Sequence, residues 1–350
     1  MTDVQTPTIE PLASSPAAGR GRGRSSQWTK LLWPLLGLAL LLLVDLVWVP
    51  NFFRIGVTEG RLTGTPIEIF RWSGPEVLLA VGMTLVLATG GVDLSVGAIM
   101  ALSGAVTAKL AAGLQWPPWG AVLSALGASA AAGAWNGALV ALLDIQPIVA
   151  TLVLMVAGRG IAELISGAAH LKVSGTLFSA LGGSPLGIPT EGLVGFGMFA
   201  AAAAFTRLTS TGLLIEATGG NRTASRFAGV NVRAVTFLAY AFSGLCAGLA
   251  GLLQTADLHG ADASKMGLYW ELDAILAAVI GGTALTGGRF SLLGAVLGAV
   301  LIVTLTTTIQ TKVPVEYALV PKAVVVLVVC LLQSETFRQN ALAPLRRRAA

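Results

Sequence analysis

The polar residues most able to bind a solute in this sequence stand in long apolar stretches. Asn136, Gln146 and Thr151 lie inside or at the start of two such stretches. Amide and hydroxyl side chains can bind a neutral, hydroxyl-rich solute through hydrogen bonds without a fixed charge. These three residues are therefore candidates for a solute path. Asn136 also lies within Gly133-x-x-x-Gly137, a spacing typical of helix packing, so a structural role for it stays open.

Two charged residues share one of these apolar stretches. Arg159 and Glu163 are four residues apart, so on a helix they lie on one face and can pair. Charges inside a membrane are costly and often functional. A structural ion pair and an ion-coupling site both fit this spacing.

Signatures of catalysis are missing from the sequence. It contains neither a P-loop nor a G-x-S-x-G nucleophile elbow. His170 and His259 have no metal-ligand spacing, and Cys246 and Cys330 lie in apolar runs that favour packing. We therefore expect no enzyme activity, no cofactor and no metal site.

The composition indicates an integral membrane protein. Of the 350 residues, 55% are hydrophobic and 11% are charged, whereas soluble domains are about a quarter charged. Soluble enzymes, disordered chains and nucleic-acid binders are thereby excluded, although the net charge is +5. The apolar runs are continuous and the chain has 43 glycines, which predicts an all-α bundle of closely packed transmembrane helices.

We predict about ten transmembrane helices, enough to place both termini on one side. The apolar runs are 31–49, 77–91, 94–112, 119–143, 147–167, 192–206, 234–256, 272–286, 291–311 and 318–333. Arginines and lysines are more numerous on the side of the termini, which predicts that both termini are cytoplasmic. The first run is longer than a signal-peptide core, so we expect an uncleaved anchor. Asp45 lies near its outer end, where we expect it to reach the interface.

Three regions follow from this pattern. Residues 1–27 are polar and rich in Pro, Ser and Gly, which predicts a disordered cytoplasmic tail. Residues 28–335 form the predicted transmembrane domain, and residues 336–350 form a basic cytoplasmic tail.

Two short apolar runs end alike, in Thr89-Gly90-Gly91 and in Thr286-Gly287-Gly288. Glu76 and Asp273 bound these runs at their other ends. Short, glycine-interrupted segments at matching places indicate a solute pathway in transporters. Chance remains an equal alternative in so glycine-rich a chain.

The predicted cytoplasmic loop 207–233 contains a compact helix signal. Asn221 is placed to cap a helix that includes Arg222 and Arg226, Gly219 precedes it, and Gly229 can end it. A short capped helix between two spans makes a rigid knob that can dock in a cleft of another protein. An ordinary basic loop would carry the arginines without needing the caps.

Four sequence blocks resemble those of one family. They are Gly90-Gly91-Val92-Asp93-Leu94-Ser95-Val96-Gly97 with Ala101-Leu102-Ser103-Gly104; Ile145-Gln146-Pro147 through Gly160; Glu216-Ala217-Thr218-Gly219 through Asn231; and Glu271-Leu272-Asp273 through Phe290. Together they resemble the sugar permease subunits of ATP-binding-cassette (ABC) importers, the ribose, xylose and galactofuranose group, over about residues 55–335. The sequence is most similar to the galactofuranose permeases of that group.

The resemblance implies a set of partners in the bacterial inner membrane. Such permeases work with a cytoplasmic ATPase, a periplasmic sugar-binding protein and a second permease subunit, identical or different, among membrane lipid. The family's coupling helix falls on Gly219–Gly229. The loop 168–190 looks short for the family, which leaves the choice of binding protein open.

Two other functions fit parts of the sequence. An ion-coupled secondary carrier would need a titratable site, for which only Arg159 and Glu163 are available. A membrane scaffold would leave the polar residues within the spans without a purpose. Ribose, xylose and other small solutes remain alternatives to a galactofuranose-like sugar.

Overall fold

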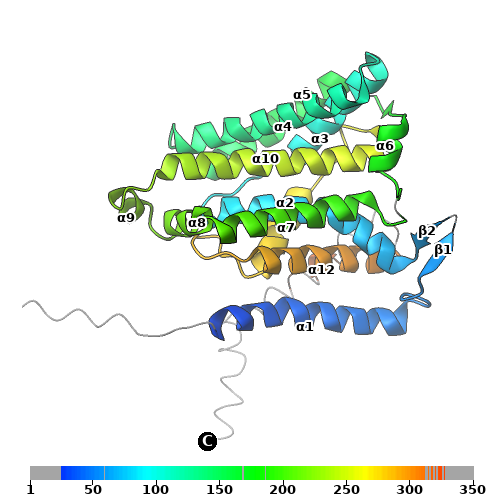
Figure 1. Cartoon of the computed structure of the whole chain (residues 1–350), viewed down its shortest axis with the longest axis horizontal. Coiled ribbons are helices and arrows are strands. Elements are labelled where there is room, and N and C mark those ends of the chain that lie inside the picture. Colours follow the sequence, from blue (N-terminus) through cyan, green and yellow to red (C-terminus); the bar gives the residue numbers. More distant parts are fainter. Residues whose placement is uncertain are drawn as a thin grey trace, which may run out of the picture.

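The computed structural model describes residues 25–327, apart from residues 59, 168, 186, 312–313, 315–316, 318–319, 321 and 325–326. Long helices lie side by side in one bundle, with short strands and helices at its two ends (Figure 1). The helices are α1 (Ser25–Trp48), α2 (Thr65–Ala88), α3 (Val96–Ala108), the π-helical turn η1 (Lys109–Gly113), α4 (Pro118–Ala141), α5 (Pro147–Ser166), α6 (Thr176–Leu181), α7 (Thr190–Leu208), α8 (Thr211–Gly220), α9 (Arg222–Phe227), α10 (Val232–Asp257), α11 (Trp270–Ile280) and α12 (Leu292–Gln310). The strands are β1 (Gly56–Thr58), β2 (Arg61–Thr63), β3 (Leu171–Lys172) and β4 (Gly260–Ala261).

Within the described part of the chain, six helices are long and apolar enough to cross a membrane. They are α1, α2, α3 with η1, α5, α10 and α12; α7 and α8, bent by 81° at their junction, add a seventh if they form one span. The count of ten and the cytoplasmic side of both termini stay predictions. Most of the predicted span 318–333, most of the tail 1–27 and all of the tail 336–350 lie outside the described residues.

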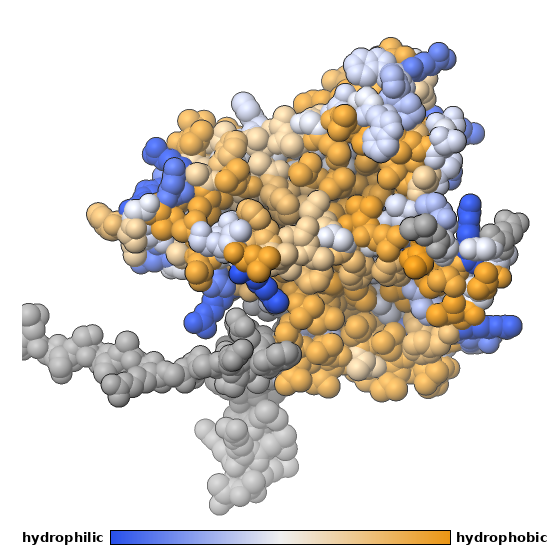
Figure 2. Space-filling model, viewed as in Figure 1, coloured by the Kyte–Doolittle hydropathy of each residue, from blue (hydrophilic) through white to orange (hydrophobic). Residues whose placement is uncertain are grey.

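The surface of the bundle is that of a membrane protein. Hydrophilic residues gather towards the two ends, and a broad apolar band lies between them (Figure 2). Large apolar side chains are exposed on several helices: Leu40 of α1 by 65%, Leu123 of α4 by 67% and Leu164 of α5 by 82%. Such a continuous apolar surface suits contact with lipid. The predicted all-α polytopic membrane fold is confirmed.

The prediction of two short spans was wrong for the first of them. Helix α2 begins at Thr65, not after Glu76, and runs for 24 residues. The helix continues through Glu76 because the bundle surrounds this residue, of which only 3% is exposed. The second span is shorter than predicted, since α11 has 11 residues and ends at Ile280.

Glycines let the central helices touch. A Cβ atom on Gly244 of α10 would lie 2.7 Å from the Cα atom of Gly133 on α4, and one on Gly133 would lie 2.8 Å from the Cα atom of Gly244. Such distances require a bare backbone on both helices. The helix-packing role that the Gly133-x-x-x-Gly137 spacing indicates is confirmed for Gly133. Helix α10 also packs on α2 and α3 to form the core.

Short antiparallel ladders join loops at one end of the bundle. Strands β1 and β2 form a hairpin, and β3 pairs with β4 in the register Leu171 to Ala261 and Lys172 to Gly260. The second ladder ties the loop after α5 to the loop after α10. The end of the bundle opposite α9 is therefore held together by backbone pairing as well as by helix packing (Figure 1).

Candidate functional site

The predicted capped helix of the 207–233 loop is present. Asn221 accepts a hydrogen bond from the backbone N–H of Ala224 at 2.9 Å and so caps α9. Gly229 ends the turn with a φ of +84°, a conformation that favours glycine. The Ser225 hydroxyl donates to the carbonyl of Ala217 on α8 at 2.8 Å. Residues 219–229, called the knob below, are therefore a rigid projection at one end of the bundle, where Figure 1 places α9.

The knob lies against both glycine breaks. A Cβ atom on Gly219 would collide with the carbonyl oxygen of Ala88, at the end of α2, and would lie 2.5 Å from the N–H nitrogen of Gly288. Gly288 itself donates to the Ala88 carbonyl at 2.9 Å. Gly287 approaches Gly90, since a Cβ on Gly287 would lie 2.9 Å from the Gly90 Cα atom. The two sequence-matched breaks thus meet at one backbone-to-backbone junction, beside the knob.

The Gly90–Gly97 motif folds around a buried carboxylate. Asp93 is fully buried and accepts hydrogen bonds from the Ser95 backbone N–H at 3.0 Å, the Ser95 hydroxyl at 2.6 Å and the Ser243 hydroxyl at 2.9 Å. Asn136 donates to the Ser95 hydroxyl at 2.8 Å, and Tyr240 donates to the carbonyl of Val92 at 3.2 Å. This network fixes the α2–α3 connection to α4 and α10.

Gly97 gives the same motif a close contact on α3. A Cβ atom at this position would collide with the carbonyl oxygen of Gly267 and with the carboxylate of Glu271. The motif therefore packs against the start of α11 as well.

The three proposed solute-path residues do not gather around one cavity. Asn136 is fully buried in the network of Asp93. Thr151 donates to the carbonyl of Pro147 at 2.9 Å, one turn earlier in α5, and Gln146 is exposed at the start of that helix. Their roles in a solute path stay predictions.

The predicted ion pair of Arg159 and Glu163 is wrong. The Arg159 guanidinium instead donates to the carbonyls of Ala263, Ser264 and Met266, at 3.1, 3.3 and 3.2 Å. A planar guanidinium suits several carbonyl groups of one turn. Arg159 therefore fastens α5 to the loop before α11.

That loop is also held by its own side chains. Asp262 accepts from the Ser264 hydroxyl at 2.6 Å and from the Ser264 N–H at 3.1 Å. These hydrogen bonds hold the pKa of Asp262 below its ordinary value. Asp262 therefore stays ionised and keeps the turn that presents its carbonyls to Arg159.

The prediction for Asp45 was also wrong. This residue is fully buried and does not reach the interface. The Thr308 hydroxyl donates to its carboxylate at 2.7 Å, because α1 packs along α12. Asp45 joins two helices that are far apart in the sequence.

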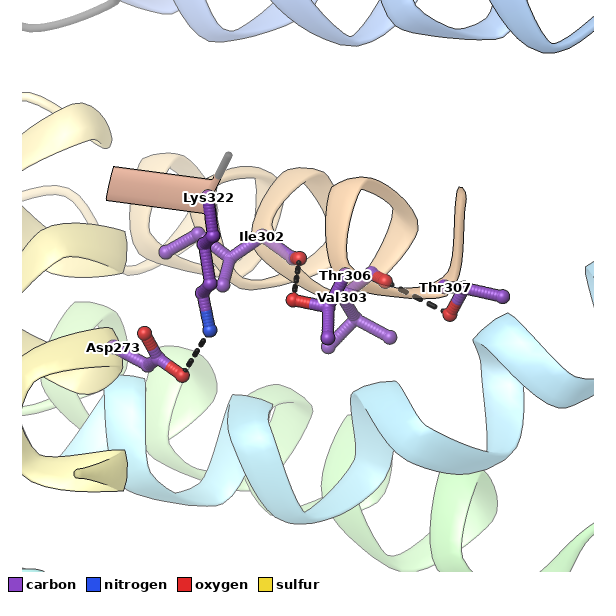
Figure 3. Close-up of polar contacts among 6 residues, drawn as sticks. All are labelled: Asp273, Ile302, Val303, Thr306, Thr307 and Lys322. Atoms are coloured by element: carbon purple, nitrogen blue, oxygen red, sulfur yellow. Dashed lines mark hydrogen bonds and ion pairs between the residues drawn. The ribbon is translucent and has the colours of Figure 1, made fainter. Parts of the chain in front are cut away.

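One cavity was missed by the sequence analysis. It has a volume of about 450 Å³ and is lined by Glu68, Trp72, Glu76, Trp270, Asp273, Ile302, Val303, Thr306, Thr307, Gln310, Thr311 and Lys322. The ion pair of Lys322 and Asp273, 2.6 Å apart, stands at one end, and α12 supplies the threonine face (Figure 3). A signal was present in the sequence, since Glu68, Trp72 and Glu76 recur every fourth residue on one face of a helix.

Long apolar helices around buried polar groups, with a rigid knob at one end, define a membrane transport protein. The chain belongs to the permease family described as the branched-chain amino acid transport system / permease component, which matches residues 65–331. This is a family of ABC-transporter permeases of bacterial membranes.

Its relatives are permeases for sugars. The chain is 48% identical over 317 residues to the galactofuranose transporter permease protein YtfT of Escherichia coli (strain K12), which covers 90% of this chain and 92% of that one. It is 37% identical to the fructose import permease protein FruF of Bifidobacterium longum (92% of each chain) and 37% identical to the ribose import permease protein RbsC of Escherichia coli (85% and 92%). No solved structure matches the chain.

Proposed function

We propose that this chain is the multi-pass inner-membrane subunit of a binding-protein-dependent ABC importer for a neutral monosaccharide. Galactofuranose is the first candidate, because the galactofuranose permease is the relative with 48% identity over 90% of the chain. The fructose and ribose permeases, at 37% identity, support the wider class of neutral sugars. Solute would arrive from a periplasmic binding protein, and a second permease subunit would complete the pathway.

The driving force would come from a separate cytoplasmic ATPase, so this chain would hold no cofactor and catalyse no reaction. The observation that carries this mechanism is the backbone contact of the knob with both glycine breaks. Gly219 lies on the Ala88 carbonyl and beside Gly288, with no side chain in between. A push on the knob would therefore reach the end of α2 and the loop before α12 as a rigid-body movement.

Arg222 is the residue of the knob that we expect to meet the ATPase. Its guanidinium lies 3.5 Å from the carbonyl of Thr89, so it also touches the first glycine break. Arg207 is an exposed arginine in the last turn of α7, outside the knob. Reversing the charge at each position in turn distinguishes docking at the knob from a general effect of positive charge near it.

The test is ATP-driven uptake of radiolabelled sugars by proteoliposomes that contain the permease and its ATPase, with binding protein outside. Galactose (as the source of its furanose form), ribose, fructose and xylose are compared. We expect one sugar to be taken up preferentially, Arg222→Glu to lower its uptake at least tenfold, and Arg207→Glu to change it less than twofold. Equal uptake by both variants would contradict the coupling role of the knob.

An ion-coupled carrier is not favoured. The relatives are ABC-importer permeases, and Arg159 is engaged by backbone carbonyls instead of by Glu163. Uptake that proceeds without ATP would be needed to bring this alternative back.

A further inference from the structure

The cavity between α2, α11 and α12 has the size and position of a solute site. Ligand pockets commonly have volumes of roughly 300–1,000 Å³, and this one has about 450 Å³. Glu76 stands in the middle of α2, 11 residues after Thr65 and 12 before Ala88. The cavity extends from this depth along α2 towards Glu68, away from the knob.

One residue of the cavity lining carries a buried acceptor without a partner. Glu76 is 97% buried, and its Oε1 atom accepts no hydrogen bond. A buried carboxylate oxygen is costly unless a donor reaches it. The neighbouring ion pair of Asp273 and Lys322 does not supply that donor, since the Lys322 hydrogen bond goes to Asp273. A donor from a ligand would satisfy the Glu76 oxygen.

The rest of the lining suits a sugar ring. Trp72 and Trp270 are half-buried and offer indole surface, on which the C–H face of a ring can stack. Thr306 and Thr307 already donate to carbonyls one turn earlier, at 2.8 and 2.9 Å, so their hydroxyl oxygens remain as acceptors (Figure 3). Gln310 adds an amide on the same helix face.

We propose that this cavity binds one uncharged monosaccharide during transport, with a sugar hydroxyl donating to the Glu76 carboxyl group. The proposal rests on the proposed function and adds the place and the charge selectivity of the site. Three of the lining residues are acidic, Glu68, Glu76 and Asp273, and one is basic, Lys322. Lys322 pairs with Asp273 and Arg71 pairs with Glu68 at 3.8 Å, which leaves the Glu76 carboxyl group without an ion pair of its own. This excess of carboxylates repels anions, so sugar phosphates and sugar acids are excluded.

The knob touches the ends of the two helices that form most of the cavity wall. Gly219 contacts α2 at Ala88, roughly 18 Å along the helix from Glu76 at 1.5 Å per residue. Gly288 lies three residues before Ser291, which caps α12, and α12 supplies the threonine face. A movement of the knob would therefore change the width of the cavity.

Cysteine labelling tests the site directly, on a background in which Cys246 and Cys330 are replaced by alanine. Thr306→Cys lines the cavity, whereas Thr304→Cys lies on the same helix, is buried and lies outside the lining. Each hydroxyl donates to the carbonyl one turn earlier, so the two substitutions remove the same kind of hydrogen bond. A small thiol-reactive methanethiosulfonate is applied to the reconstituted transporter before sugar uptake is measured.

We expect the reagent to lower uptake by Thr306→Cys at least fivefold and uptake by Thr304→Cys less than twofold. The transported sugar, added with binding protein, should slow the labelling of Thr306→Cys at least threefold, whereas its phosphate should not. Labelling that is not slowed by sugar would overturn the proposal. So would spontaneous disulfides between two copies through Thr306→Cys, because the second permease would then fill the cavity and leave no room for a solute.

A second pair of variants is made in the chain with its natural cysteines left in place. Glu76→Gln should lower uptake at least tenfold, because an amide reverses part of the hydrogen bonding that a sugar hydroxyl needs. Glu191→Gln is the matched control, since Glu191 is 1% exposed, its carboxylate oxygens also accept no hydrogen bond, and it lies outside the cavity lining. Equal uptake by the two variants would overturn the proposed site while the importer function stands. Absence of ATP-driven uptake by the unaltered chain would overturn the importer function itself.

Discussion

Asp93 is the residue on which the Gly90–Gly97 motif depends. Its two carboxylate oxygens accept from the N–H and hydroxyl groups of Ser95 and from the hydroxyl of Ser243, within a fully buried site. Hydrogen bonds to a charged group are stronger than those between neutral groups. The carboxylate therefore holds the turn between α2 and α3 on the face of α10.

Asp93→Asn should destabilise the permease by about 2 kcal/mol, because the new amide N–H₂ would face hydroxyl donors and leave one of them unsatisfied. The measurement is thermal unfolding of the purified protein in detergent. Asp144→Asn is the matched control: Asp144 is exposed with a φ of +56°, a conformation that Asn also adopts readily. Equal melting temperatures for the two variants would show that the Asp93 network does not stabilise the fold.

At this scale, the sequence predicted residues whose partners are near in the chain. Asn221 and Gly229 were found because a helix cap is decided within a few positions. The burial of Asp45 and Glu76 was not predicted, because the residues around them come from α12 and α11, more than 190 residues away in the sequence. Arg159 likewise binds carbonyls 104–107 residues further on.

Among the elements, the contact of α8 with α2 depends on one of two adjacent glycines. Gly219→Ala would place a methyl group against the Ala88 carbonyl, whereas a Cβ on Gly220 would meet no atom within 4 Å. We expect Gly219→Ala to lower ATP-driven uptake at least fivefold and Gly220→Ala to leave it within twofold. The comparison is made in proteoliposomes at equal amounts of reconstituted protein; equal rates would contradict transmission through this contact.

Helix α4 offers a second pair of glycines with opposite expectations. A methyl group on Gly133 would push against α10, so Gly133→Ala should cost about 1–3 kcal/mol through overpacking. Gly127 has open space around its missing Cβ, so Gly127→Ala should stabilise by about 0.5–1 kcal/mol through helix propensity. Thermal unfolding in detergent should shift in opposite directions, and a loss of stability in both would contradict the packing account.

The elements themselves were largely predictable, because long apolar runs and their breaks are local features. The exceptions come from burial. A charge at Glu76 was taken as the end of a span, but the bundle surrounds that residue and the helix continues to Thr65. Helix α11 ends early, at Ile280, and the backbone of the next residue, Gly281, packs closely against Gly294 of α12.

For the whole molecule, the structure joins three features that are separate in the sequence. The knob, the two glycine breaks and the cavity lie along α2 and α12. The sequence predicted the knob and the breaks but could not predict their junction, since it depends on how helices pack across 130 to 200 residues of chain. This arrangement leads from the proposed ATPase surface to the proposed solute site without passing through a flexible linker.

The most direct test of the central claim is the energy source of sugar uptake by the unaltered chain. Proteoliposomes with permease, ATPase and binding protein are compared with liposomes that contain the permease alone under an imposed proton or sodium gradient. We expect uptake only in the complete system, and only when ATP is present on the side of the membrane that carries the ATPase. Gradient-driven uptake by the permease alone would contradict the assignment as an ABC importer subunit.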